Sequence, residues 1–569
     1  GSDVSQLEAM VSHIGAYCAE QGIQPLPGIC LPPLSDALEL AQLHQPVGGS
    51  GIQVAVGWMD NPDQQRQDPL VLDLTAANTF VVGSSQMGKT TLLRTIATAI
   101  IQSYSVQDVN LYLIDCGNMS LKVLEDARHV GGVVLATEEE RMENLFKLLF
   151  RCVEQRRSHM AERGVGTYSD YLEAGFRDIP QIVVLLDNIS AFREYYDKLM
   201  DSLLVLTREG LSVGISFVLT ASQANGLSYK SQANFNRRIV FTCTDSSEYS
   251  TLLGRSRLTP KPIAGRALTL HDKQILECQI ALTGASLREI ERVEALRSLI
   301  EARNGETEGA AVPIPMVPDT LPLEQVFTEH PELFRTPGCL PIGLDYNQVE
   351  FVCLDLFQCV TCALLGSDHG GRRGFLMAFL EELQRTIVLH PTEVYIFDNS
   401  SRELEGIEKY GMVHGYCSDP AEAVAYVEEL CDHLHGRSQE KKQDTRLVVV
   451  LEDRTLLQNA MKDKETAGLL LQLMKDLQKC GGLLLVSGLE NTALSFNAPE
   501  FFKQLREHRC GLLFGNLSDC RFYEVNMKQS KEFTRSITKG DAYFFQEGAL
   551  MRLKTIQSGG KGSYEDGRQ

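Results

Sequence analysis

Short apolar runs rich in β-branched residues alternate with amphipathic helical stretches along most of the chain. In the first half such runs occupy residues 109–115, 181–187 and 214–220, and a long helical pattern covers 138–163. Runs this short and this apolar are typical of parallel strands that are buried on both faces. We therefore predict an α/β fold in which helices flank a mostly parallel sheet.

The apolar runs of the second half repeat those of the first half in the same order and at similar spacing. The matching pairs are 55–59 with 341–345, 79–84 with 362–367, 111–115 with 394–398, 183–188 with 448–453, and 214–219 with 482–487. Ordered matches of this kind are typical of a tandem duplication. A length of 569 residues with 43% hydrophobic content also exceeds what one core accommodates, so at least two domains are predicted.

Breaks in this pattern give the predicted divisions of the chain. They are 1–48 (an N-terminal helix and a Pro-rich linker), 49–303 (first domain), 304–338 (linker), 339–557 (second domain) and 558–569 (a disordered tail). The opening Gly1-Ser2 is typical of what remains of a cleaved expression tag. We therefore expect the natural protein to extend further at its N-terminus, with room for a membrane anchor.

One loop between a predicted strand and a predicted helix matches the phosphate-binding consensus GxxxxGK[ST] without a mismatch. The predicted nucleotide-binding residues are Gly83, Ser84, Ser85, Gln86, Met87, Gly88, Lys89, Thr90 and Thr91. In such a loop the backbone N–H groups surround the phosphates, Lys89 reaches the β- and γ-phosphates, and the Thr90 hydroxyl ligates Mg²⁺. The chain is thus predicted to be a tandem P-loop NTPase whose cofactors are ATP and Mg²⁺.

Catalysis needs an acidic residue at the end of a neighbouring strand and a group that activates water. Asp187 is the favoured ligand for the Mg²⁺ shell, and Asp115 is the rival candidate. The residue after Asp187 is Asn188, where many such ATPases have Glu, and an amide cannot accept the proton of the attacking water. We expect binding with low turnover, and whether the chain is an ATPase stays open. An arginine from a neighbouring module could complete the site; the candidates are Arg208, Arg237, Arg238, Arg255 and Arg257.

The corresponding loop of the second domain is degenerate. The residues of this second candidate site are Gly366, Gly371, Arg372, Arg373, Glu452 and Asp453. Arg372 stands where the lysine belongs and could still pair with a phosphate, whereas Arg373 supplies no hydroxyl for a metal. Two interpretations remain open, retained nucleotide binding or a lost site. A domain that keeps the fold and loses the chemistry commonly serves as a binding platform.

Charge, hydrophobic run length and cysteine content argue against a nucleic-acid surface, a membrane span and a zinc site. The net charge of −20 and the pI near 5.1 argue against a surface that grips nucleic acid. No stretch of 18 or more apolar residues occurs, so the chain as given is expected to be soluble. The scattered cysteines suit a reducing compartment, and Cys359 and Cys362 form a CxxC without the further ligands of a zinc site.

Several segments, in the order in which they occur, resemble FtsK/SpoIIIE-type ATPase modules. They are 83–91, the strand end at Asp115, Arg128-His-Val-Gly-Gly132, the strand end at 187–188, 214–219 and Gly265-Arg-Ala-Leu268. Two such modules, the second degenerate, and the linker Ile29-Cys-Leu-Pro-Pro-Leu34 resemble the C-terminal part of the EssC/EccC motors of bacterial type VII secretion. Ala221-Ser-Gln223 is similar to the family's Ala-Thr-Gln, which implies that Gln223 senses the γ-phosphate.

The resemblance implies a membrane-anchored motor on the cytoplasmic face of the cell membrane. Such a motor recruits small helical WXG-type effectors, here through the second module, works with other subunits of the machinery, and forms a homo-hexamer in the full-length protein. The alternative is an FtsK-like DNA translocase, which the acidic composition and the short tail disfavour. A third hypothesis is a scaffold and receptor that binds ATP without turnover.

Overall fold

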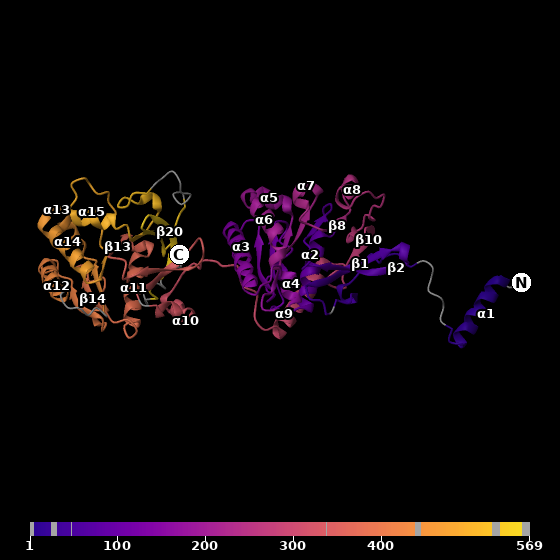
Figure 1. Cartoon of the computed structure of the whole chain (residues 1–569), viewed down its shortest axis with the longest axis horizontal. Coiled ribbons are helices and arrows are strands. Elements are labelled where there is room, and N and C mark those ends of the chain that lie inside the picture. Colours follow the sequence, from indigo (N-terminus) through magenta and orange to yellow (C-terminus); the bar gives the residue numbers. More distant parts are fainter. Residues whose placement is uncertain are drawn as a thin grey trace. The chain divides into compact units, whose positions relative to one another are not determined.

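A computed structural model of the chain describes residues 5–23, 31–46, 48–336, 338–438, 445–525 and 535–559. The chain divides into unit 1, Gly1–Pro315, and unit 2, Met316–Gln569 (Figure 1). The predictions for Gly1-Ser2, for residues 24–30 of the Pro-rich linker and for residues 560–569 of the tail lie outside the described residues.

Unit 1 is a ten-stranded sheet with helices on both faces. Its strands are β1 (Gln53–Asn61), β2 (Arg66–Asp73), β3 (Thr79–Val82), β4 (Val109–Asp115), β5 (Val130–Leu135), β6 (Gln181–Asp187), β7 (Ile215–Ala221), β8 (Arg237–Phe241), β9 (Arg266–His271) and β10 (Gln274–Ile280). Its helices are α1 (Gln6–Glu20), α2 (Lys89–Ser103), α3 (Glu139–Glu162), α4 (Tyr168–Glu173), α5 (Ile189–Tyr195), α6 (Asp197–Glu209), α7 (Tyr229–Gln232), α8 (Ser247–Leu253) and α9 (Glu289–Glu306). The strand order is β2-β1-β10-β9-β8-β3-β7-β6-β4-β5.

Unit 2 has the same kind of sheet. Its strands are β11 (Cys339–Asp345), β12 (Phe351–Asp355), β13 (Thr361–Gly366), β14 (Thr392–Phe397), β15 (Val413–Cys417), β16 (Arg446–Leu451), β17 (Leu483–Val486), β18 (Gly511–Phe514), β19 (Asp541–Gln546) and β20 (Ala549–Thr555). Its helices are α10 (Leu323–Glu329), α11 (Arg372–Arg385), α12 (Ala423–Ser438), α13 (Arg454–Lys462), α14 (Lys464–Lys479) and α15 (Glu500–Glu507). The strand order is β12-β11-β20-β19-β18-β13-β17-β16-β14-β15.

The two strand orders are identical once ten is subtracted from each strand number of unit 2. The agreement reaches details of register, because β1 pairs with β2 through a shift between Ala55 and Gly57, and β11 pairs with β12 through a shift between Pro341 and Gly343. The central strands pair in parallel, as in β3 with β7 and β13 with β17, and are buried along their length. The predicted α/β fold with tandem, mostly parallel sheets is confirmed.

Two stretches expected to be linkers pack on unit 1. Residues 31–46 bury Leu38, Leu40 and Leu43, and the Leu40 N–H donates to the carbonyl of Leu282 just beyond β10. Residues 311–315, hereafter the strap, run along the outer edge of β5 and bury Ile314 in the core. Unit 1 therefore extends beyond the predicted 49–303 on both sides, because proline-rich sequence carries no periodic signal of the surface it covers.

Candidate nucleotide-binding sites

The phosphate loop of unit 1 leaves β3 and enters α2 at Lys89. Two of its glycines have little room for a side chain. A Cβ on Gly83 would lie 2.6 Å from the Cβ of Phe241, and a Cβ on Gly88 would lie 3.1 Å from the amide nitrogen of Gly265. Gly88 also has a φ of 111°, which side chains disfavour. Glycine at both positions therefore lets the loop backbone pack against Phe241 and Gly265 as it turns into α2, and anions bind at the N-terminus of such a helix.

Thr90 and Asp187 meet at the metal position of this loop. The Thr90 hydroxyl donates to Oδ2 of Asp187 over 2.8 Å, and the Thr220 hydroxyl donates to Oδ1 over 2.5 Å. Burial raises the pKa of Asp187 against the lowering effect of both hydrogen bonds. A buried carboxylate in need of positive charge, next to a threonine hydroxyl, supplies the oxygen ligands that Mg²⁺ prefers. These residues fit the metal.

Lys89 lies curled over its own loop. Its Nζ donates to the carbonyls of Gly83 and Ser84 over 2.6 and 2.8 Å. Burial lowers the pKa of Lys89, and the charge of Asp187 is the main opposing influence. A phosphate would offer charged acceptors in place of neutral carbonyls and stabilise the ammonium form.

Asp115 is engaged elsewhere, although its strand is adjacent to that of Asp187. Its Oδ1 accepts from the Gly117 N–H and its Oδ2 from the Leu121 N–H, both over 2.9 Å, so it holds the loop that follows β4. The structure thus brings Asp187, and not its rival, to Thr90.

Asn188 adopts a left-handed backbone conformation with φ of 67° and caps α5. Its side-chain oxygen accepts from the Ala191 N–H over 3.2 Å, and its own N–H donates to the Thr220 hydroxyl over 2.8 Å. The side chain borders the cavity, and its amide oxygen can accept a hydrogen bond but cannot take a proton from water. Its geometry offers no general base.

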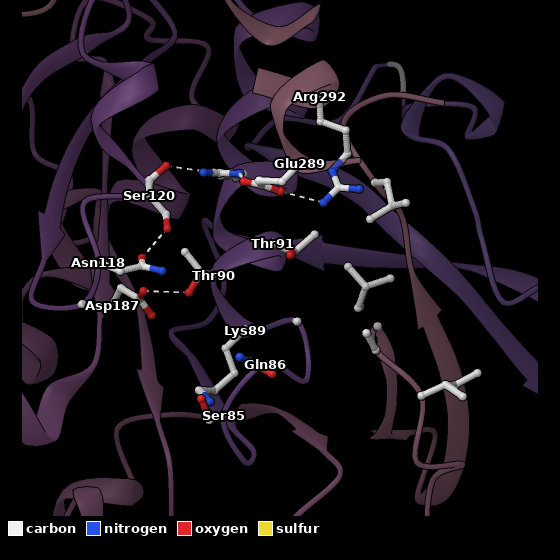
Figure 2. A pocket seen from close by; sticks show the side chains of 18 of the residues that line it. Ser85, Gln86, Lys89, Thr90, Thr91, Asn118, Ser120, Asp187, Glu289 and Arg292 are labelled. Carbon is white, nitrogen blue, oxygen red and sulfur yellow. Dashed lines mark hydrogen bonds and ion pairs between the residues drawn. The ribbon is translucent and has the colours of Figure 1, made fainter. Parts of the chain in front are cut away.

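A cavity of about 870 Å³ extends from the phosphate loop toward the start of α9 (Figure 2). Sequence reasoning missed the residues at its far end. Arg94 pairs with Glu289 and donates to the Ser120 carbonyl over 2.8 Å, and Arg292 pairs with Glu289 over 2.6 Å. Leu287 lies on the same wall. The helical pattern at 284–302 predicted α9 but carried no signal of where the helix would lie.

Some predicted residues lie away from this cavity. Gln223 is exposed at the start of a short 3-10 turn, and the lining contains its neighbours Ala221 and Ser222 instead. The five candidate arginines are also absent from the lining of the described cavity. Arg238, for example, donates to the carbonyl of Leu252 over 2.7 Å.

In unit 2 the corresponding site is filled by its own arginine. Arg372 is 3% exposed, and its Nη1 donates to both oxygens of Glu452 over 2.9 and 2.8 Å. Its Nη2 donates to Asp368 over 2.6 Å. Burial opposes the charge on Arg372, but the hydrogen bonds and charges of Glu452 and Asp368 raise the pKa of the guanidinium above its ordinary value. The guanidinium of Arg372 thus lies between the loop and the strand end at Glu452, in the place that a bound cation would take.

The remaining groups of the second site leave little for a phosphate. Arg373, at the position of Thr90, is exposed and donates to the carbonyl of Glu403. Asp453, at the position of Asn188, caps α13 by accepting from the N–H groups of Thr455 and Leu456 over 2.9 and 3.1 Å. The loop glycines Gly366 and Gly371 have φ of 102° and 103°.

The cysteine pair of unit 2 lies at the other end of the sheet. Cys359 approaches Cys510 with 3.1 Å between the sulfur atoms, and Cys362 is buried in the core. Among the described residues no cluster of three or more His, Cys, Asp and Glu side chains is arranged to hold a metal ion.

Comparisons with known proteins agree with the geometry. Residues 37–245 match the model of the FtsK/SpoIIIE family. The ESX secretion system protein EccC of Geobacillus thermodenitrificans is 26% identical over 97% of this chain and 37% of its own length. The structure of EssC (ATPases 2 and 3) from the same organism has a TM-score of 0.78 at 25% identity, covering 93% of this chain and all of that one. Thermomonospora curvata EccC (ATPases 2 and 3), in complex with a signal sequence peptide, shares the fold with a TM-score of 0.62 at 21% identity, covering 93% of this chain and 97% of that one.

The chain spans between 25% and 37% of the length of the first curated relatives it matches. None of its helices, within the part of the chain that the structure describes, combines the length and hydrophobicity of a membrane span. A P-loop fold of this family implies a bound nucleotide and, with it, Mg²⁺. Residues 37–245 of the first unit therefore resemble the FtsK/SpoIIIE family, and the chain as a whole is similar to the second and third ATPase modules of EssC and EccC.

Proposed function

We propose that this chain is the ATP-binding portion of a type VII secretion motor. In this proposal the full-length protein is anchored in the membrane, acts at its cytoplasmic face, and drives the export of small helical WXG-type effectors as a homo-hexamer with other subunits of the machinery. The observation that carries the proposal is the complete set of Lys89, Thr90 and Asp187 in unit 1 of a chain whose relatives are secretion ATPases.

Unit 1 holds Mg-ATP with little turnover. Lys89 leaves the loop carbonyls and pairs with the β- and γ-phosphates, while Thr90 and Asp187 hold the shell of the Mg²⁺ that neutralises them. Water activation is missing because Asn188, whose oxygen also caps α5, is an amide and cannot accept a proton. ATP therefore serves here mainly as a structural or regulatory ligand.

Unit 2 is the receptor for the effector. Its phosphate site is filled by Arg372, and it carries an apolar pocket of about 280 Å³ between α13, α15 and the chain beyond β17. The lining includes Leu457, Met461, Leu494 and Phe502, with Lys462 and Glu490 among its charged members. A small apolar pocket with charged groups suits one or two aliphatic side chains of a signal peptide. The signal peptide bound by the Thermomonospora relative supports this role.

Calorimetry with Mg-ATP tests the first part. The change Lys89→Ala is expected to remove detectable binding, a loss of at least about a hundredfold, because a buried charge-assisted contact to the phosphates disappears. Lys230→Ala, on an exposed lysine of the same unit, is the control and should bind as the parent chain does. Unchanged binding by the Lys89 variant would refute the proposal for unit 1. Brisk hydrolysis that depends on Lys89 would refute the low-turnover part alone.

Fluorescence anisotropy with the C-terminal peptide of a WXG-type effector tests the receptor. The change Met461→Asp places a charge in the apolar pocket and should weaken binding about tenfold or more. Tyr195→Asp, which alters an exposed side chain of unit 1, should have no effect. Equal affinities of parent chain and Met461 variant would exclude this pocket.

A further inference from the structure

The strap of unit 1 is added to the outer edge of β5 like a short extra strand. The Ala311 N–H donates to the Arg128 carbonyl over 2.7 Å, and the Ile314 N–H donates to the Gly131 carbonyl over 3.1 Å. Ile314 is 5% exposed and belongs to the core cluster between the sheet and α3. A segment of the connector thus completes the edge of the unit that it leaves.

Two side chains of unit 1 hydrogen-bond to the strap, one to a carbonyl before Ile314 in the sequence and one to a carbonyl after it. The Tyr112 hydroxyl donates to the Val312 carbonyl over 2.7 Å, and the Asn144 side chain donates to the Pro315 carbonyl over 3.0 Å. Ile314 is flanked by prolines, which have no N–H to leave unsatisfied at a sheet edge. It packs over Gly132, where a Cβ would lie 2.7 Å from the isoleucine Cδ1.

The edge strand of unit 2 is built in the same way. Both β4–β5 and β14–β15 pair in parallel with one register shift, after which Tyr112 is opposite Gly132 in unit 1 and Tyr395 is opposite Gly415 in unit 2. Within the described chain β15 is the last strand of its sheet. The Tyr395 hydroxyl has no hydrogen-bond partner among the described residues, whereas that of Tyr112 holds the strap.

A side chain of α12 lies where Ile314 lies in unit 1. A Cβ on Gly415 would come within 1.5 Å of the Tyr426 hydroxyl oxygen, and the Tyr426 ring packs 5.2 Å from that of Phe397. Tyr426 is only half-buried, and burial raises its pKa to about 12, so it is neutral at physiological pH. Moving it toward solvent breaks no hydrogen bond or ion pair between described residues.

We propose that the outer edge of β15 binds an extended peptide with an aliphatic residue between two prolines, and that this residue displaces the Tyr426 phenol from Gly415. The occupant is inferred from the strap, the sequence that covers the equivalent edge of the same fold. The Tyr395 hydroxyl binds a peptide carbonyl as Tyr112 does. This site goes beyond the proposed receptor pocket, since β15 and the lining of that pocket share no residue.

A labelled peptide with the sequence of residues 308–317 is the probe, and its anisotropy is measured against the full chain. The parent chain is expected to bind it weakly, and Tyr426→Ala about fivefold or more tightly because the position over Gly415 is open. Adding Tyr395→Phe to that variant should cost about fivefold to tenfold through one lost hydrogen bond. A probe with Asp at the Ile314 position is the peptide control. Tyr112→Phe controls for entry of the probe into unit 1 and should change nothing.

Several other outcomes would contradict the proposal. Equal affinity of the probe for the parent chain, for Tyr426→Ala and for the Tyr426→Ala variant with Tyr395→Phe added would place the probe elsewhere. Absence of binding to every variant at millimolar concentration would exclude the site. A photoreactive residue at the Met316 position of the probe should cross-link within residues 411–426. Loss of probe binding in Met461→Asp would assign it to the apolar pocket and leave the proposed function standing.

Discussion

The two phosphate loops occupy the same place in the same fold and differ in where their positive charge comes from. Unit 1 has a lysine that rests on loop carbonyls and a buried acid, Asp187, that accepts hydrogen bonds from two threonine hydroxyls. Unit 2 has an arginine bonded to the corresponding acid at Glu452. Under the proposed function a ligand completes the first site, whereas Arg372 of the chain itself occupies the second. A duplicated domain can therefore lose its ligand while keeping the electrostatic balance of the site.

The largest expected effect is on stability, which should fall much more when the arginine of the second loop is replaced than when the lysine of the first loop is. Arg372→Met leaves Glu452 buried without its partner and should destabilise unit 2 by about 3–5 kcal/mol. Lys89→Met removes two bonds to neutral carbonyls and the attraction between the ammonium and Asp187, with no direct ion pair lost, and should cost unit 1 about 1 kcal/mol. Hydrogen exchange measured on peptides from β16 and from β6 reports the stability of unit 2 and of unit 1 separately. Similar losses in both would show that Arg372 is not the internal substitute for a ligand.

The next largest effect is expected on Mg-ATP binding, from a substitution at the metal position of unit 1. Thr90→Val removes the hydroxyl next to Asp187 and should weaken Mg-ATP binding about tenfold to a hundredfold, or about 1.4–2.8 kcal/mol. Calorimetry with excess chelator is the matched measurement, and there the variant and the parent chain should agree. A loss of equal size without Mg²⁺ would mean that Thr90 contacts the phosphates instead.

Low pH should destabilise unit 2, because it protonates the acid of a second internal ion pair. Asp541 is fully buried against Lys554 at 2.6 Å and Arg552 at 3.0 Å. Burial alone would raise its pKa, but these partners hold the pKa of Asp541 below its ordinary value. Its stabilisation is complete above the ordinary pKa of about 4 and is lost as the pH falls through the lower folded value. Chemical denaturation between pH 3 and 7, compared with Asp541→Asn, should show a steeper acid loss in the parent chain.

The smallest effect concerns turnover. Asn188→Glu places a carboxylate beside the metal position and should raise ATP hydrolysis by less than about tenfold, since none of the five candidate arginines lines the described cavity. The left-handed backbone at this position should cost about 1 kcal/mol with Glu. Phosphate release at saturating ATP measures the rate. A rise of several hundredfold would show that Asn188 alone limits unit 1.

Strands and the phosphate loop could be predicted from the sequence, whereas contacts between residues far apart in the sequence could not. The apolar runs and the loop around Lys89 predicted the sheets and the first site, because strand burial and phosphate binding each have a local signature. The pairing of Arg372 with Glu452 joins residues 80 positions apart. Ile314 lies in a proline-rich stretch that resembles a linker by composition alone. Arg292 reaches the cavity only through the placement of α9, for which no motif exists.

Helix α9 begins at the nucleotide cavity and ends next to the strap. Its first turn carries Glu289 and Arg292, and near its last turn Arg303 donates to the carbonyl of Ile101 over 3.0 Å. At 18 residues it is a rigid rod about 27 Å long. The helix therefore joins the wall of the nucleotide cavity to the chain that runs into the strap, since Asn304 and Thr307 at its C-terminal end both bond to Arg128, whose carbonyl holds Ala311.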